Sequence, residues 1–227
     1  SLVITDPEGF KFASDKDLKP NIPFLLVRNL ESTFDYLCQI FYPDKPKFVM
    51  GVTGTNGKTS VVNFSQQLIE KKNNSCVTIG TLGVGGVLSL RTDNTTPDQS
   101  FIARILQMAK LKGANYALLE VSSHSIVQKR IKNLAFNVFC FTNLSQDHLD
   151  YHKDMETYFH AKLSILDMLR LDTNIIVNID DEYGKIFLAK AKDKGFKIET
   201  IGFSDTADVK LRVTQGTPEI QFIEIIR

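Results

Sequence analysis

Short apolar runs alternate with stretches of helical spacing along most of the chain, beginning near Lys47. The apolar runs are rich in β-branched and aromatic residues, which is typical of strands. Such alternation is the pattern of a parallel sheet flanked by helices, so we predict an α/β fold. The predicted strands are Phe48–Thr53, Val77–Thr81, Tyr116–Glu120, Asn137–Phe141, Ile175–Ile179 and Lys197–Gly202.

Helices are predicted between these strands. Thr59–Lys72 places its apolar residues at helical spacing and so predicts an amphipathic helix. Thr96, followed by Pro97, has the features of an N-cap, so a second helix is expected to begin there and to end near Gly113. Two further helices are predicted at Met155–Leu169 and Glu182–Lys194.

The two ends of the chain depart from this pattern. Residues 1–46 carry Pro20, Pro23, Pro43 and Pro46 and one clear helix, Leu30–Phe41, so we interpret them as the remnant of a preceding domain and its linker. Near the other end, apolar and polar residues alternate from Val209 to Val213 before a turn at Gly216-Thr217-Pro218, which predicts a small antiparallel hairpin appended to the sheet. Residues 47–227 are therefore the expected main domain.

Charge and cysteine content limit the classes of function. The 27 basic and 26 acidic side chains leave a net charge of +1, so we expect no long-range attraction to nucleic acid or to an anionic membrane. Cys38, Cys76 and Cys140 are odd in number and far apart, which favours reduced core thiols and a cytoplasmic setting. The first residues lack the pattern of a signal peptide. They also lack an initiator Met, so a fragment of a longer protein is an open alternative.

A glycine-rich segment joins the first predicted strand to the first predicted helix. In Gly54-Thr55-Asn56-Gly57-Lys58-Thr59-Ser60, backbone N–H groups and the helix N-terminus can converge on phosphates, while Lys58 adds a full positive charge. Thr59 is placed to ligate Mg²⁺. Val52 occupies the place of the first glycine of the usual phosphate-loop pattern, so a plain turn with a solvated lysine is the alternative. A second glycine run, Gly83–Gly86, is interpreted as a flexible hairpin or loop.

The form of this loop resembles that of the Mur ligases and the folylpolyglutamate synthases. Three further segments narrow the resemblance by their order and spacing: Asn94-Thr95-Thr96-Pro97, Glu120-Val121-Ser122-Ser123-His124, and Thr142 to His152 with the sequence TNLSQDHLDYH. Together they are similar to the UDP-N-acetylmuramoyl-tripeptide synthetase branch of the Mur ligase family, from about Lys47 to Gly202.

The resemblance implies an ADP-forming ligase that uses ATP and Mg²⁺ to join an amino acid to UDP-N-acetylmuramoyl-L-alanyl-D-glutamate in peptidoglycan synthesis. It implies nucleotide binding by Gly54, Thr55, Asn56, Gly57, Lys58, Thr59, Ser60, Asn143, Asn178 and Asp180. It implies substrate binding by Asn94, Thr95, Thr96, Ser122, Gln128 and Arg130. It implies metal binding by Thr59, Glu120, His148 and Lys162, and catalytic roles for Lys58, Lys162 and His148. We expect a monomer that binds neither nucleic acid nor membrane.

Several of these residues have plainer interpretations. Glu120 ends a predicted strand where it can reach a metal held by Thr59, or it can face water. Lys162 is by spacing a surface lysine, whereas the resemblance implies a carbamylated lysine that gives oxygen to a second metal near His148. Thr96 is also expected to cap a helix.

Alternatives remain for the strand end and for the function as well. The segment Asn178 to Asp181 fits an adenine-side motif or a simple capping turn. A folylpolyglutamate synthase-type ligase shares the phosphate loop, although Glu120–His124 and Asp147–His152 argue against it. A nucleotide-binding fragment that is inactive by itself is the remaining alternative.

Overall fold

The structure is a computed structural model that describes residues 2–16, 22–146, 154–216 and 221–227. The chain divides into two compact units, Ser1–Pro43 and Asp44–Arg227. No described helix is long and apolar enough to cross a membrane.

The first unit contains more secondary structure than the sequence predicted. Strands β1 (Val3–Thr5) and β2 (Phe24–Leu26) pair in parallel, with helix α1 (Pro7–Asp15) between them and helix α2 (Leu30–Phe41) after them. The prediction of α2 is confirmed, but the expectation of a single helix here was wrong. Three-residue strands are too short to show a period-two pattern, which explains the omission.

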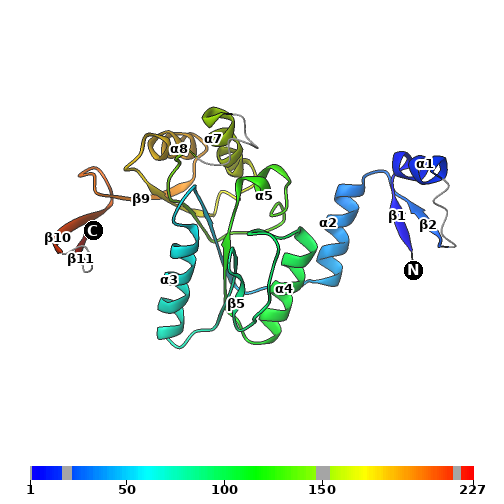
Figure 1. Cartoon of the computed structure of the whole chain (residues 1–227), viewed down its shortest axis with the longest axis horizontal. Helices are drawn as coiled ribbons and strands as arrows, with labels where there is room; N and C mark the ends of the chain where they lie inside the picture. Colours follow the sequence, from blue (N-terminus) through cyan, green and yellow to red (C-terminus); the bar gives the residue numbers. More distant parts are fainter. Residues whose placement is uncertain (1, 17–21, 147–153, 217–220) are drawn as a thin grey trace. The chain divides into compact units, whose positions relative to one another are not determined.

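The second unit is built on one sheet, for which the described residues supply nine strands in the order β11-β10-β9-β8-β7-β3-β6-β4-β5 (Figure 1). The strands from β4 to β10 along this order pair in parallel, and β5 and β11 are antiparallel edge strands. Their bounds are β3 (Phe48–Thr53), β4 (Cys76–Gly80), β5 (Gly83–Gly86), β6 (Tyr116–Glu120), β7 (Val138–Phe141), β8 (Asn174–Asn178), β9 (Lys197–Gly202), β10 (Val209–Gly216) and β11 (Gln221–Ile226).

The predicted α/β class, the parallel strands and the terminal antiparallel hairpin are confirmed. Thr217 and Pro218 of the predicted turn lie outside the described residues. Of the two alternatives for the glycine run Gly83–Gly86, the hairpin is confirmed and the loop is wrong, because the run forms β5 and pairs antiparallel along β4. Gly86 has a φ of +80°, and a Cβ there would collide with the carbonyl oxygen of Cys76. The glycines therefore allow close pairing at the sheet edge.

Helices cover both faces of the sheet. They are α3 (Lys58–Lys71), α4 (Gln99–Leu111), α5 (Ser123–Val127), α7 (Met155–Leu163) with the 3₁₀ turn η1 (Ser164–Asp167), and α8 (Glu182–Asp193). Alternate strand residues face opposite sides, so Val52 and Leu118 pack with Val62 of α3, while Leu119 and Phe139 belong to the core that includes residues of α4, α5, α7 and α8. Figure 1 shows α3 and α4 on opposite sides of the sheet.

The start of α4 differs from the prediction. Asp98 is the N-cap, and its carboxylate accepts a 2.9 Å hydrogen bond from the N–H of Phe101. Thr96 does not cap the helix, because its hydroxyl donates to the carbonyl of Glu120 at 2.8 Å. The capping assignment to Thr96 was wrong, since a long-range partner holds its hydroxyl.

The helix predicted at Met155–Leu169 also ends early. α7 stops at Leu163, and the chain continues as the tighter turn η1.

The three cysteines are buried and none of them forms a disulfide, as expected for reduced thiols. Burial raises the pKa of the Cys140 thiol to about 12. In Cys76, burial and the nearby Glu70 carboxylate raise the pKa to about 11. Both thiols therefore stay protonated at neutral pH and behave as small apolar core residues.

Candidate nucleotide-binding site

The glycine loop follows β3 directly and ends at the first turn of α3. Gly57 is the N-cap of α3 with a left-handed φ of +86°, and Gly54 has a φ of +148°. A Cβ at Gly54 would collide with the hydroxyl of Thr142, so this position needs glycine for both conformation and space. Within the described residues, no side chain caps α3. A helix N-terminus without a side-chain cap favours the binding of an anion.

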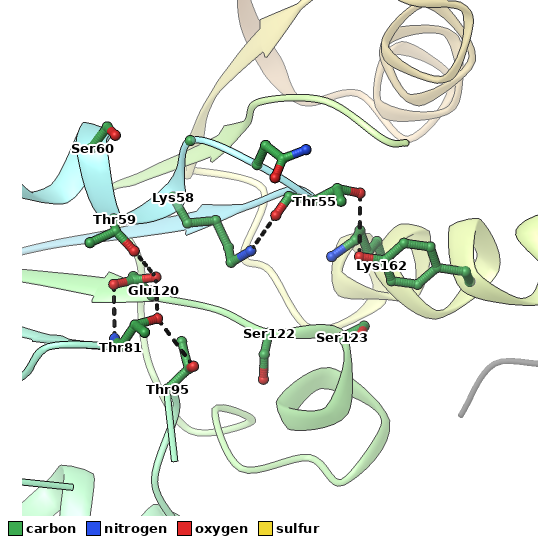
Figure 2. Close-up of a pocket in the computed structure, with 13 residues that line it drawn as sticks. Thr55, Lys58, Thr59, Ser60, Thr81, Thr95, Glu120, Ser122, Ser123 and Lys162 are labelled. Atoms are coloured by element: carbon green, nitrogen blue, oxygen red, sulfur yellow. Dashed lines mark hydrogen bonds between the residues drawn. The ribbon is translucent and has the colours of Figure 1, made fainter. Parts of the chain in front are cut away.

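Lys58 lies against the loop. Its Nζ donates hydrogen bonds to the carbonyl oxygens of Gly54, at 2.9 Å, and Thr55, at 2.8 Å. Figure 2 shows the lysine side chain reaching back over the loop toward Thr55. The alternative of a solvated lysine does not fit these contacts, because two loop carbonyls hold the ammonium.

Thr142 and Asn143, which directly follow β7, hold Asn56 at the tip of the loop by hydrogen bonds. Asn143 accepts from the N–H of Asn56 through Oδ1 at 3.0 Å and donates to its carbonyl through Nδ2 at 3.1 Å. The hydroxyl of Thr142 donates to the same carbonyl at 2.7 Å. Asn143, which the resemblance places at the nucleotide, thus contacts the loop itself.

The carboxylate of Glu120 lies beside the hydroxyl that begins α3. The Thr59 hydroxyl donates to Oε2 of Glu120 at 2.8 Å. Glu120 is only 2% exposed, so the alternative of a charged strand end facing water is wrong. β6 is the neighbour of β3 in the sheet, and both strands end at the same edge, which explains why side chains 61 positions apart meet.

Lys162 is not a surface lysine. Its side chain is 1% exposed, and Nζ donates a 3.0 Å hydrogen bond to the carbonyl of Gly54. The same ammonium lies 4.6 Å from the ring centroid of Tyr158 on the preceding turn of α7. The expectation from spacing failed because α7 packs against the core with this lysine facing the phosphate loop.

Most of the predicted substrate residues form a network of hydrogen bonds at the end of β6. Thr96 Oγ1 accepts from the N–H of Ser122 at 3.1 Å. Arg130 donates to the carbonyl of Thr96 at 2.6 Å and to Oε1 of Gln128 at 2.9 Å. The Thr95 hydroxyl lies 3.2 Å from that of Thr81, while Asn94 is exposed in the same loop.

A pocket of about 270 Å³ opens between the phosphate loop, the ends of β4 and β6, and α7 (Figure 2). It is lined by Thr55, Asn56, Gly57, Lys58, Thr59, Ser60, Thr81, Thr95, Glu120, Ser122, Ser123, Tyr158 and Lys162.

The pocket gathers most of the predicted loop and metal residues, but other predicted residues are not in its lining: Gly54, Asn94, Thr96, Gln128, Arg130, Asn143, Asn178 and Asp180. His148 lies outside the described residues. Sequence reasoning missed Thr81, Ser123 and Tyr158 as lining residues. Thr81 directly follows β4, and ligands of α/β proteins bind at the carboxyl ends of the parallel strands, so its position in the sequence could have predicted a place in the pocket.

The strand end at β8 is held by its own contacts. The Asn178 side chain accepts from the N–H of Asp180 at 2.9 Å, and Asp180 accepts from the N–H of Phe203 at 2.8 Å. Asp181 caps α8 by accepting from the N–H of Gly184. These contacts are those of a capping turn, and an adenine-side role for Asn178 and Asp180 remains a proposal.

The strand, glycine loop and helix with a lysine over the loop define a nucleotide-binding α/β domain of the phosphate-loop type. Residues 52–226 match the model of the Mur ligase middle domain. The chain therefore belongs to the Mur ligase family.

A curated relative is the UDP-N-acetylmuramoyl-L-alanyl-D-glutamate–2,6-diaminopimelate ligase of Buchnera aphidicola subsp. Schizaphis graminum. It is 42% identical over 177 residues, which cover 77% of this chain and 35% of the relative. A solved structure of a ligase with the same name aligns with a TM-score of 0.72 at 26% identity, covering 88% of this chain and 44% of that one. This chain thus spans less than half the length of either protein.

A third comparison extends the likeness of fold. The MurF ligase from Thermotoga maritima, solved in complex with ADP, aligns with a TM-score of 0.66 at 16% identity, covering 99% of this chain and 52% of that one. At this identity the likeness shows the fold alone.

Proposed function

We propose that the intact protein is an ATP-dependent ligase that adds the third amino acid to UDP-N-acetylmuramoyl-L-alanyl-D-glutamate. This chain of 227 residues is proposed to be its nucleotide-binding core. One observation carries the proposal: Lys58, Lys162 and the Thr59–Glu120 pair line one pocket around the phosphate loop. The 42% identity to a ligase that acts on this precursor supports the choice of substrate.

In the proposed reaction, a carboxylate oxygen of the precursor attacks the γ-phosphorus of ATP. The bond from that phosphorus to the β,γ-bridging oxygen breaks, which gives an acyl phosphate and ADP. The incoming amine then attacks the acyl carbon, orthophosphate leaves, and the amine loses a proton as the amide forms. Catalysis of the first step is mainly positioning and charge neutralisation, for which the ammonium of Lys58 and the N-terminus of α3 are placed.

The residues at the mouth of the loop fit a magnesium ion. The Thr59 hydroxyl and the Glu120 carboxylate are hard oxygen donors on adjacent elements, with Oγ1 and Oε2 2.8 Å apart. Mg²⁺ bound there would supply positive charge to the phosphates. An ammonium at Lys162 would repel a cation, whereas a carbamate at this position would add an anionic oxygen donor, so we propose that Lys162 is carbamylated in the active enzyme.

The relatives also suggest the amine and the setting. Their names specify 2,6-diaminopimelate, so we propose it as the amino acid that is added. We propose a monomer in the cytoplasm that binds neither nucleic acid nor membrane. The lack of a disulfide among the three cysteines supports the cytoplasmic setting, and the net charge of +1 supports the lack of attraction to nucleic acid or membrane. We propose residues 1–46 as part of a UDP-binding domain and residues 47–227 as the ATP-binding domain.

The test compares this chain with the full-length protein in an assay of ADP release. With ATP, Mg²⁺, the UDP-linked dipeptide and diaminopimelate, the full-length protein should release ADP and form the tripeptide. The 227-residue chain should bind ATP but turn over little substrate, because it spans less than half the length of these relatives and we propose that further domains complete the site. A full-length protein that leaves this precursor unchanged but extends a folate with glutamate would favour the folylpolyglutamate alternative.

A further inference from the structure

The residue after β4 holds the Glu120 carboxylate at both of its oxygens. The N–H of Thr81 donates to Oε1 at 2.9 Å, and the Thr81 hydroxyl donates to Oε2 at 3.1 Å. Oε2 also accepts from Thr59 at 2.8 Å. Figure 2 shows Glu120 between Thr59 on one side and Thr81 on the other.

The single proton of the Thr81 hydroxyl gives this network a direction. A hydroxyl has one proton to donate and two lone pairs that accept. Because the Thr81 proton goes to Glu120, the Thr81–Thr95 contact at 3.2 Å requires Thr95 to be the donor. A chain of hydrogen bonds therefore runs from Thr95 through Thr81 to Glu120, and it joins the predicted substrate loop to the carboxylate beside the phosphate loop.

The residue before Thr81, Gly80, lies directly against the same carboxylate. A Cβ on Gly80 would collide with Oε1 of Glu120, so only glycine lets β4 approach this closely. The Thr81 side chain is itself exposed and lines the pocket. Its hydroxyl is therefore not needed to fill the core, and the contacts that it makes are those to Glu120 and Thr95.

We propose that Thr81 is a positioning residue that fixes the orientation of the Glu120 carboxylate, so that Oε2 faces the Thr59 hydroxyl, and that links this carboxylate to Thr95. The inference rests on the proposed nucleotide site. Without the Thr81 hydroxyl, Oε2 loses one of its two donors and the carboxylate can rotate about its last torsion. Hydrogen-bond partners of metal-binding carboxylates typically change metal affinity by about 10- to 100-fold when removed.

The experiment measures ATP binding to the 227-residue chain by calorimetry over a series of Mg²⁺ concentrations. Thr81→Val removes the hydroxyl and keeps the shape, whereas Thr81→Ser keeps the hydroxyl. In Thr81→Val the Mg²⁺ concentration for half-maximal ATP binding should rise by about 10-fold or more. Thr81→Ser should remain close to the unmodified chain. The melting temperature of Thr81→Val without ligand should change little, because the side chain is exposed.

Thr173→Val is the matched control. Thr173 is fully buried and donates to the carbonyl of Phe136 at 2.9 Å, just before β8 begins at the opposite end of the sheet from the phosphate loop. Its loss should lower the melting temperature and leave the Mg²⁺ dependence unchanged. Loss of a threonine hydroxyl as such is thereby separated from loss at this site.

Three results would overturn the inference. In the first, the Mg²⁺ dependence of ATP binding is unchanged in Thr81→Val but is lost in Glu120→Gln. This result would exclude a positioning role for Thr81 and leave the proposed function intact. Equal defects in Thr81→Val and Thr81→Ser would trace the effect to packing. If the unmodified chain shows no Mg²⁺-dependent ATP binding, the proposed nucleotide site fails and the role of Thr81 fails with it.

Discussion

The ammonium of Lys162 donates a 3.0 Å hydrogen bond to the carbonyl of Gly54, 108 positions earlier in the chain. This contact joins α7 to the first glycine of the phosphate loop. At 1% exposure the lysine sits where an unpartnered charge would be costly. Its position at the loop therefore indicates a functional role rather than a solubilising one.

Replacing Lys162 in the full-length protein should abolish ligation. Lys162→Ala removes the amine that would carry the carbamate, and Lys162→Arg keeps positive charge but cannot form it. We expect ADP release to fall to background in both variants. Short exogenous carboxylates should partly restore Lys162→Ala, since they can replace the missing oxygen donor.

Near-normal ADP release in Lys162→Arg would rule out the carbamate. The lysine would then act as a buried cation that holds the loop carbonyl of Gly54. Lys190→Arg, on the exposed face of α8, is the control for the substitution itself and should keep full activity.

Lys58→Ala should weaken ATP binding by the 227-residue chain at least about 10-fold, because a hydrogen bond to a charged group contributes roughly 1.5–3 kcal/mol. Calorimetry gives the affinity directly. Lys71→Ala, at the other end of α3, should bind ATP as the unmodified chain does. Equal affinities of a folded Lys58→Ala variant and the unmodified chain would exclude Lys58 from the phosphate site.

Gly80→Ala should reduce Mg²⁺-dependent ATP binding although Gly80 is not among the residues that line the pocket. Its new Cβ would displace the Glu120 carboxylate, whereas the strand backbone at Gly80 accepts alanine. Gly85→Ala in β5 is the matched control, because its Cβ meets the Thr78 hydroxyl at 2.6 Å and does not approach Glu120. Similar binding defects in both variants would point to distortion of the sheet edge.

Asp208→Asn should destabilise the fold in a pH-dependent way. Hydrogen bonds from the hydroxyl and then the N–H of Thr200 hold the pKa of Asp208 below its ordinary value of 3.8. A carboxylate whose pKa is lower in the folded state stabilises the protein fully above the unfolded value and loses that contribution as the pH falls through the folded one. The melting temperature should therefore drop in Asp208→Asn at neutral pH, and this difference should shrink below about pH 4.

The control for Asp208 is its neighbour Asp205. Its carboxylate is 94% exposed and lies 3.7 Å from Lys210, so Asp205→Asn should change the melting temperature little at neutral pH. A difference between Asp208→Asn and the unmodified chain that persists unchanged at low pH would show that charge on Asp208 is not its source.

The sequence by itself determined the central architecture and the phosphate loop, because both depend on local patterns. Apolar runs predicted β3 and β6 to the residue, since these central parallel strands are buried along almost all of their length. The bounds of β9 were also predicted to the residue, although this strand is only partly buried. The loop from Gly54 to Thr59 was recognisable because its glycines and lysine are adjacent in the chain.

Only the tertiary structure decided which side chains the loop meets. Lys162 looked like a surface residue because burial depends on how α7 packs, which spacing within one helix does not reveal. Thr96 looked like a helix cap because its partner, the carbonyl of Glu120, is 24 positions away. The hydrogen bond from Thr81 to Glu120 forms because β4 pairs with β6. The physical reason is the same in each case, since long-range packing and strand pairing bring together groups that no local sequence pattern connects.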